Sequence, residues 1–131
     1  NKEVIFISDF NKNINYNLII SSSCIQYIQD WKKLIEKFSK LKPKYIYLCD
    51  LFAGNIKKDF VSIQKYYDSR IPQWFFREDI FLKEFSNNGY ELILKEVADI
   101  YRLDKRIKIN MTNFPKQYQI KNTLNVLFKR K

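Results

Sequence analysis

The stretch Asn17-Leu18-Ile19-Ile20-Ser21-Ser22-Ser23-Cys24-Ile25-Gln26-Tyr27 decides how the rest of the chain is interpreted. A short apolar run ends in small residues, and an amphipathic segment follows at once. This order predicts a buried parallel strand over residues 16–22 that ends at a crevice. Because ligands of open α/β sheets bind at the carboxyl ends of the strands, we expect a binding site at the serine run.

The segment that follows predicts a helix with one apolar face. Five apolar residues recur at helical spacing: Trp31, Leu34, Ile35, Phe38 and Leu41. Asp30 precedes them as a candidate N-cap, and Lys42-Pro43 ends the helix. A β-rich run over residues 45–49 comes next, so the three elements predict a right-handed βαβ unit with parallel strands.

The remaining elements are expected on either side of this unit. In chain order they are a strand over 4–8, a long polar and aromatic loop or lid from Gly54 to Trp74, a helix from Glu78 to Gly89, a strand over 90–97, irregular chain over 99–122 and a last strand over 123–128. Glu78 and Asp79 suit the positive end of the helix dipole, which explains them without paired acid–base catalysis. We expect residues 1–131 to form a single α/β domain.

Composition narrows the function classes. The chain has 131 residues and no histidine, so Ser-His triads and histidine-ligated metals are excluded within it, and we expect no metal site. It has no apolar run long enough for a membrane span and no signal peptide. Cys24 and Cys49 have no zinc-site spacing; we interpret both as buried free thiols and expect a cytoplasmic protein. Because the sequence begins with Asn, we expect a piece of a longer chain or a processed product.

The net charge of +10 is concentrated toward the carboxyl end, over residues 102–131. A basic tail of this kind is compatible with nucleic acid or an anionic surface. The alternative is that an AT-rich genome accounts for the lysines at solvent-facing positions. We favour this alternative, so nucleic-acid binding is not the expected function.

Several segments together resemble a known family. The chain is similar to the second half of class I S-adenosylmethionine-dependent methyltransferases, and more closely to a family of proposed methyltransferases with an SS-x-LQY signature on strand four. The matching segments are Leu18–Ser23 with Ile25–Ile28, then Ile63-Gln64, Ile71–Phe75, Gly89–Leu92, Asn113–Pro115 and Leu124–Phe128. The resemblance implies a Rossmann-like sheet with parallel strands and an antiparallel last strand. It also implies S-adenosylmethionine as cofactor and, from the genes that often accompany the family, a role in polysaccharide biosynthesis.

The chain also departs from that family. Its members carry a glycine-rich turn after their first strand and an acid after their second, whereas Gly54 and Gly89 are the only glycines here. The resemblance therefore implies an incomplete domain that lacks its first two strands and is inactive alone. The strand over 4–8 would lack its native neighbour, and an open edge beside the central strand would favour a homodimer.

The resemblance assigns roles to individual residues. It places Asp9 near the adenine, and Ser21, Ser22, Ser23, Gln26 and Tyr27 around the cofactor. Each has a structural alternative: Asp9 forms a turn, the serines allow tight packing, and Tyr27 belongs to the core.

Other residues are candidates for the acceptor side. Asp50 follows the strand over 45–49 and lies on the same edge as the serines, so it is a candidate general base for a substrate hydroxyl. The alternative is that it caps the next turn. Gln64, Tyr67 and Trp74, with Pro72, belong to the expected lid, where the resemblance implies substrate binding; aromatic residues there also serve as loop anchors.

Three functions follow. The first is a methyltransferase acting on a small-molecule or saccharide acceptor. Methyl transfer mainly needs proximity and orientation, so a universal catalytic residue is not expected. The second is a non-catalytic α/β module that self-associates, and the third is a basic nucleic-acid-binding domain.

Overall fold

The computed structural model describes residues 4, 9–10, 13–98, 100–102, 105–107 and 109–131. The strand expected over 4–8 therefore lies outside the described residues, except for the exposed Val4. None of the helices in the described ranges is long and apolar enough to cross a membrane.

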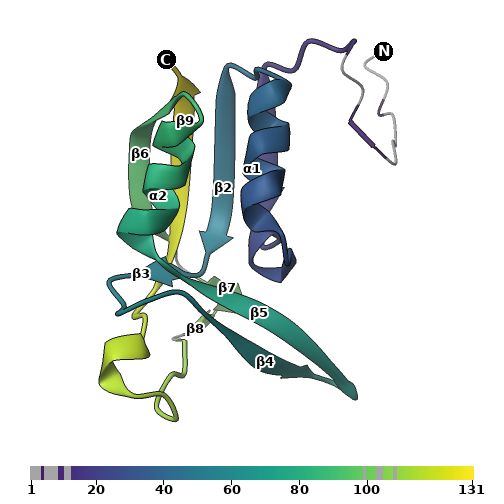
Figure 1. Ribbon diagram of the computed structural model, residues 1–131. Helices are drawn as coiled ribbons and strands as arrows, with labels where there is room; N and C mark the ends of the chain where they lie inside the picture. Colours follow the sequence, from purple (N-terminus) through teal and green to yellow (C-terminus); the bar gives the residue numbers. More distant parts are fainter. Residues whose placement is uncertain (1–3, 5–8, 11–12, 99, 103–104, 108) are drawn as a thin grey trace.

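The centre of the molecule is a four-stranded mixed sheet (Figure 1). Its strands, in spatial order, are β1 (Leu18–Ser22), β2 (Tyr45–Leu51), β9 (Thr123–Arg130) and β6 (Tyr90–Ala98). β1 and β2 are parallel, with Ile19 opposite Ile46, and β9 runs antiparallel to both of its neighbours. The parallel βαβ unit and the antiparallel last strand are thus as predicted, although β9 includes two residues that the sequence suggested as a basic tail.

Two helices cover one face of this sheet (Figure 1). Helix α1 (Trp31–Lys40) begins directly after Asp30, whose carboxylate forms an ion pair with Lys33 at 3.0 Å instead of capping the backbone. Helix α2 (Glu78–Asn87) has two acids in its first turn, which the helix dipole favours. Gly89, two residues beyond the end of the helix, adopts φ +87°, the left-handed conformation that glycine supplies without strain.

The main core lies between the sheet and these helices and is rich in aromatic rings. Trp31 of α1 packs against Phe76 with ring centroids 5.1 Å apart, and Phe85 of α2 stacks on Phe128 of β9 at 4.1 Å. All four side chains are almost completely buried. Truncation of a buried ring of this size to alanine lowers the free energy of unfolding by about 3–5 kcal/mol. This cluster therefore fixes both helices on the sheet.

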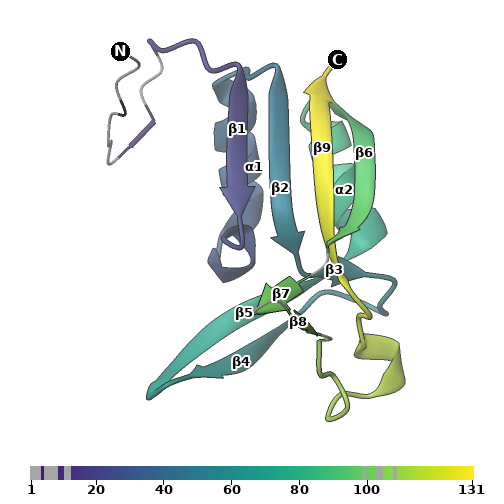
Figure 2. The same cartoon turned by 180° about the vertical axis from the view of Figure 1, so that it is seen from behind.

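In the part of the chain that the structure describes, no helix covers the opposite face of the sheet (Figure 2). Its apolar side chains remain exposed, for example Leu18 and Ile20 on β1 and Leu94 on β6. Within the described residues, the outer edge of β1 has no strand beside it.

The prediction of a loop from Gly54 to Trp74 is wrong. This region forms a second sheet made of β3 (Ala53–Gly54), β5 (Ser69–Arg77) and β4 (Phe60–Tyr66), in which β4 and β5 make a long hairpin. Tyr66 pairs with Ser69 across a turn in which Tyr67 has φ +51°. The turn has neither the glycine nor the asparagine that usually marks a hairpin, so the strands on either side were not recognised.

The base of the hairpin has its own small core. Phe75 stacks on Phe60 at 4.9 Å and joins Ile56, Met111 and Ile120. Gly54 is needed for this packing, because a Cβ atom there would lie 2.8 Å from the Ile120 side chain.

The region predicted to be irregular, 99–122, has more structure than expected. It contains the paired short strands β7 (Ile100–Arg102) and β8 (Lys105–Ile107) and a 3₁₀ helix, η2 (Lys116–Tyr118). Contacts with the hairpin core order this segment, and such contacts leave no periodic pattern in the local sequence.

Candidate functional site

The carboxyl ends of β1 and β2 carry two residues in strained backbone conformations. Ser23 has φ +46° and Asp50 has φ +53°. Non-glycine residues rarely adopt this region, and when they do they often belong to functional sites. Sequence periodicity gave no signal for this strain.

Hydrogen bonds hold these two residues together. The Ser23 hydroxyl donates to the Asp50 carboxylate at 2.9 Å, and the Ser23 amide donates to the Cys49 carbonyl at 3.0 Å. The Asp50 amide donates to Oδ1 of Asn125 on β9 at 3.2 Å. Residues of three strands thus meet at Asp50, which is half-buried and whose carboxylate accepts from Ser23.

The 3₁₀ helix η1 (Ile25–Tyr27) lies next to this edge and carries two polar side chains. Tyr27 is partly exposed, and its hydroxyl donates to Gln64 of β4 at 2.9 Å. Gln26 is 0% exposed, yet neither its Nε2 nor its Oε1 has a hydrogen-bond partner. A buried amide with both groups unpaired is costly, so it needs an explanation.

Burial raises the pKa of the Tyr27 phenol above its ordinary value. The neighbouring amides of Gln26 and Gln64 oppose this shift, but the Gln26 amide lies beside the phenol without completing a hydrogen bond to it. At neutral pH the Tyr27 hydroxyl is therefore protonated and acts as a hydrogen-bond donor.

A pocket of about 430 Å³ lies between η1 and the hairpin. The residues that line it are Tyr27, Gln29, Val61, Ile71, Pro72 and Trp74. This volume suits a small molecule, and an apolar lining with a few polar groups is typical of such sites. The pocket brings together Tyr27, predicted on the cofactor side, and Trp74, predicted on the acceptor side.

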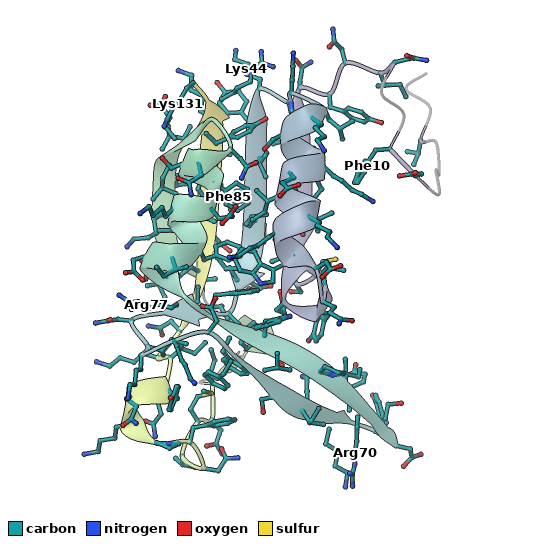
Figure 3. The ribbon with its side chains drawn as sticks, in the orientation of Figure 1. Phe10, Lys44, Arg70, Arg77, Phe85 and Lys131 are labelled. Carbon is teal, nitrogen blue, oxygen red and sulfur yellow. The ribbon has the colours of Figure 1, made fainter. Side chains whose placement is uncertain are left out.

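Two predicted site residues lie away from both this pocket and the Ser23–Asp50 edge. Tyr67 lies at the tip of the hairpin, 80% exposed, with its ring against Tyr66. Asp9 lines a different pocket with Lys37 and Lys40, at the end of α1 that leads to the start of β2. That is the opposite end of the sheet from Ser23, and Figure 3 shows the adjacent Phe10 there.

Sequence reasoning missed some members of the site. Asn125, which holds the Asp50 amide, is a polar residue within an apolar strand, and that contrast was the available signal. Gln73 of β5 is also buried, with its Nε2 unpaired. The cysteines are free thiols as predicted, but the prediction that both are buried is wrong, because Cys24 is exposed and Cys49 is half-buried. Within the described ranges, no group of His, Cys, Asp or Glu side chains could hold a metal ion.

Comparison with known proteins is informative at the level of the fold. No protein-family model matches the chain, and no curated protein is similar to it in sequence. Among solved structures, the fold is similar to that of a proposed S-adenosylmethionine-dependent methyltransferase from Listeria monocytogenes, with a TM-score of 0.61 and 9% identity. The alignment covers 94% of this chain and 65% of the Listeria protein, so the chain spans just under two thirds of that protein's length. At this identity the similarity establishes the fold alone.

Proposed function

We propose that this chain forms part of an S-adenosylmethionine-dependent methyltransferase that acts on a small-molecule acceptor. The observation that carries the proposal is the position of β9, which is antiparallel and lies between β2 and β6. The methyltransferase sheet that the sequence resembles has this arrangement, and the Listeria protein shares the fold.

The site residues support the same proposal. Ser21, Ser22 and Ser23 supply hydroxyls at the end of β1, and Gln26 supplies a buried amide with no partner in the folded chain. An amide that is orphaned inside the protein is a group that a bound ligand would satisfy. We therefore assign these residues, with Tyr27, to the S-adenosylmethionine side; when bound, that cofactor would supply a methyl group on a sulfonium.

The acceptor side lies toward the hairpin in this proposal. The acceptor would occupy the pocket between Tyr27 and Trp74, where Gln64 holds the Tyr27 hydroxyl in place. Asp50 would accept a proton from an acceptor hydroxyl, because its carboxylate is held by Ser23 and the residue is only half-buried. A saccharide acceptor, a role in polysaccharide biosynthesis and a cytoplasmic location belong to the proposal as well.

The first experiment is thermal melting of the full-length gene product with and without S-adenosylhomocysteine. We expect a rise in Tm, because a ligand at 100 times its Kd adds roughly 2.7 kcal/mol to stability. Asp50→Asn should keep that rise and lose methyl transfer, since asparagine tolerates the left-handed backbone and only the charge is removed. Lys58→Gln, which removes one charge from an exposed side chain that is not a member of the candidate site, is the matched control. No rise in the full-length protein would contradict the proposal.

A second function is favoured by the uncovered sheet face. Leu18 and Ile20 are exposed on β1, and within the described part of the chain no strand pairs with the outer edge of β1. The chain would then be a self-associating, non-catalytic module, as a homodimer or with another partner. Its signature is a Tm that rises with protein concentration and does not respond to S-adenosylhomocysteine.

A further inference from the structure

A second pocket, of about 410 Å³, lies at the amino end of β1 and β2. Five of the residues that line it are basic: Lys42, Lys44, Lys129, Arg130 and Lys131. Figure 3 shows Lys44 and Lys131 near each other at this end of the sheet, with Arg77 at the other end. We refer to these five residues as the basic pocket.

Backbone hydrogen bonds fix the segments of the basic pocket relative to one another. The Arg130 amide donates to the Lys44 carbonyl at 3.0 Å, and the Arg130 guanidinium donates to the Lys42 carbonyl. On the other side, the Tyr45 amide donates to the Asn17 carbonyl at 2.9 Å. Three stretches that are far apart in the sequence are thus held together before any ligand binds, and such preorganisation lowers the cost of binding.

Among the described residues, no acid forms an ion pair with the side chains of the basic pocket. Its lining includes no Asp or Glu, and none of the four ion pairs found among the described residues involves its five cations. The nearest acid by strand register is Glu91, opposite Lys129 on β6. Five like charges around one concavity repel each other, and an anion bound among them would relieve that repulsion.

We propose that the basic pocket binds a small polyphosphate, a ligand of the class of pyrophosphate or a nucleoside diphosphate. Several clustered negative charges match the five cations, and Arg130 adds a fork that suits phosphate oxygens. The volume suits one small molecule. Asn15 and Asn17 line the same pocket, and their side chains are of a type that can hydrogen-bond a part of the ligand other than phosphate.

A nucleic-acid strand fits these observations less well. It needs a continuous basic track, whereas Asp9 lines the pocket that Lys37 and Lys40 form at the carboxyl end of α1. The proposal is also independent of the methyltransferase assignment, because the basic pocket shares no residue with the site around Ser23 and Asp50 and lies at the other end of the strands.

Calorimetric titration of the 131-residue chain with tripolyphosphate at low salt tests this proposal. We expect saturable binding at one site. The triple variant Lys44→Gln, Lys129→Gln, Lys131→Gln should bind about tenfold or more weakly, from the loss of three charge contacts. The matched control changes three exposed lysines elsewhere, Lys57, Lys65 and Lys83, to Gln and should stay within about threefold of the wild type.

A single variant separates binding from folding. Lys42 has φ +52°, so Lys42→Gly relieves backbone strain while it removes one of the five charges. We expect a higher Tm together with weaker tripolyphosphate binding, a pair of changes that damage to the fold cannot produce.

Two results would overturn the proposal. One is equal tripolyphosphate affinity in the triple variant and its matched control, which would assign the binding to net charge alone. The other is tighter binding of a 12-residue single-stranded oligonucleotide than of tripolyphosphate with a steep salt dependence, which would identify a nucleic-acid surface instead.

Discussion

Replacement of Gln26 by methionine should stabilise the chain. Both polar atoms of the Gln26 side chain are buried without a hydrogen-bond partner, and an unsatisfied buried group costs about 1–3 kcal/mol. Methionine has a similar length and volume and carries no polar group that needs a partner. We therefore expect Gln26→Met to raise the free energy of unfolding by about 1–3 kcal/mol.

In a domain of 131 residues, this gain corresponds to a rise in Tm of about 4–10 °C. Urea denaturation followed by circular dichroism gives the free energy directly. Gln117→Met is the matched control, because Gln117 is exposed and its substitution should change stability by less than about 0.5 kcal/mol.

The same substitution should have the opposite effect on ligand binding. In the full-length gene product, we expect Gln26→Met to lose the stabilisation by S-adenosylhomocysteine, because it removes the amide that we propose to meet the ligand. A protein that becomes more stable and binds less is expected where a polar group is kept for function.

The reasoning would be refuted if Gln26→Met lowered the free energy of unfolding by more than about 1 kcal/mol. The amide would then be satisfied in the folded chain, for example by an ordered water or by Tyr27, and it could not be offered as an orphaned ligand-binding group.

Three further predictions concern the scaffold. Gly54→Ala should lower the free energy of unfolding by about 1–3 kcal/mol, because the new Cβ would lie 2.8 Å from the Ile120 side chain. Urea denaturation measures this change, and an unchanged midpoint would mean that the Ile120 side chain moves aside without cost. Tyr90→Phe should lower the free energy of unfolding by about 1–2 kcal/mol near neutral pH, because it leaves the buried Pro43 carbonyl without the hydrogen bond from the Tyr90 hydroxyl. Burial also raises the pKa of Tyr90, so the contribution of its hydroxyl to stability is complete below the ordinary tyrosine pKa and is lost as pH rises through the raised value. In a series of urea denaturations above pH 9, the free energy of unfolding should therefore fall more steeply for the wild type than for Tyr90→Phe. Tyr67→Gly should raise Tm by a few degrees, since glycine accepts φ +51°, and a lower Tm would show that the Tyr67 ring contact matters more.

Local sequence determined the elements whose signals are periodic. The apolar stripe from Trp31 to Phe38 gave helix α1, and the run over 45–49 gave most of β2, because side chains at fixed spacing must share one buried face. The serine run at the end of β1 lies at the same edge of the sheet as Asp50, as its position in the sequence predicted. Part of the candidate site was therefore predictable, namely the part that lies at the end of a strand.

Only the tertiary structure decided the rest. The hairpin of β4 and β5 was missed because its turn at Tyr67 carries no glycine signal, so Gln64 and Trp74 were placed in a loop when they belong to strands. Asp9 was grouped with the serines by analogy, and the fold puts it at the other end of the sheet.

The basic pocket gives the clearest contrast between the two sources of information. Sequence showed an excess of positive charge toward the carboxyl end, as a property of one segment. The sheet instead brings residues 129–131 beside Lys42 and Lys44, because β9 pairs antiparallel with β2 and its last residues meet the start of that strand. Composition sets how much charge a chain carries, whereas strand pairing decides which charges face one another, since pairing joins residues that no local pattern relates.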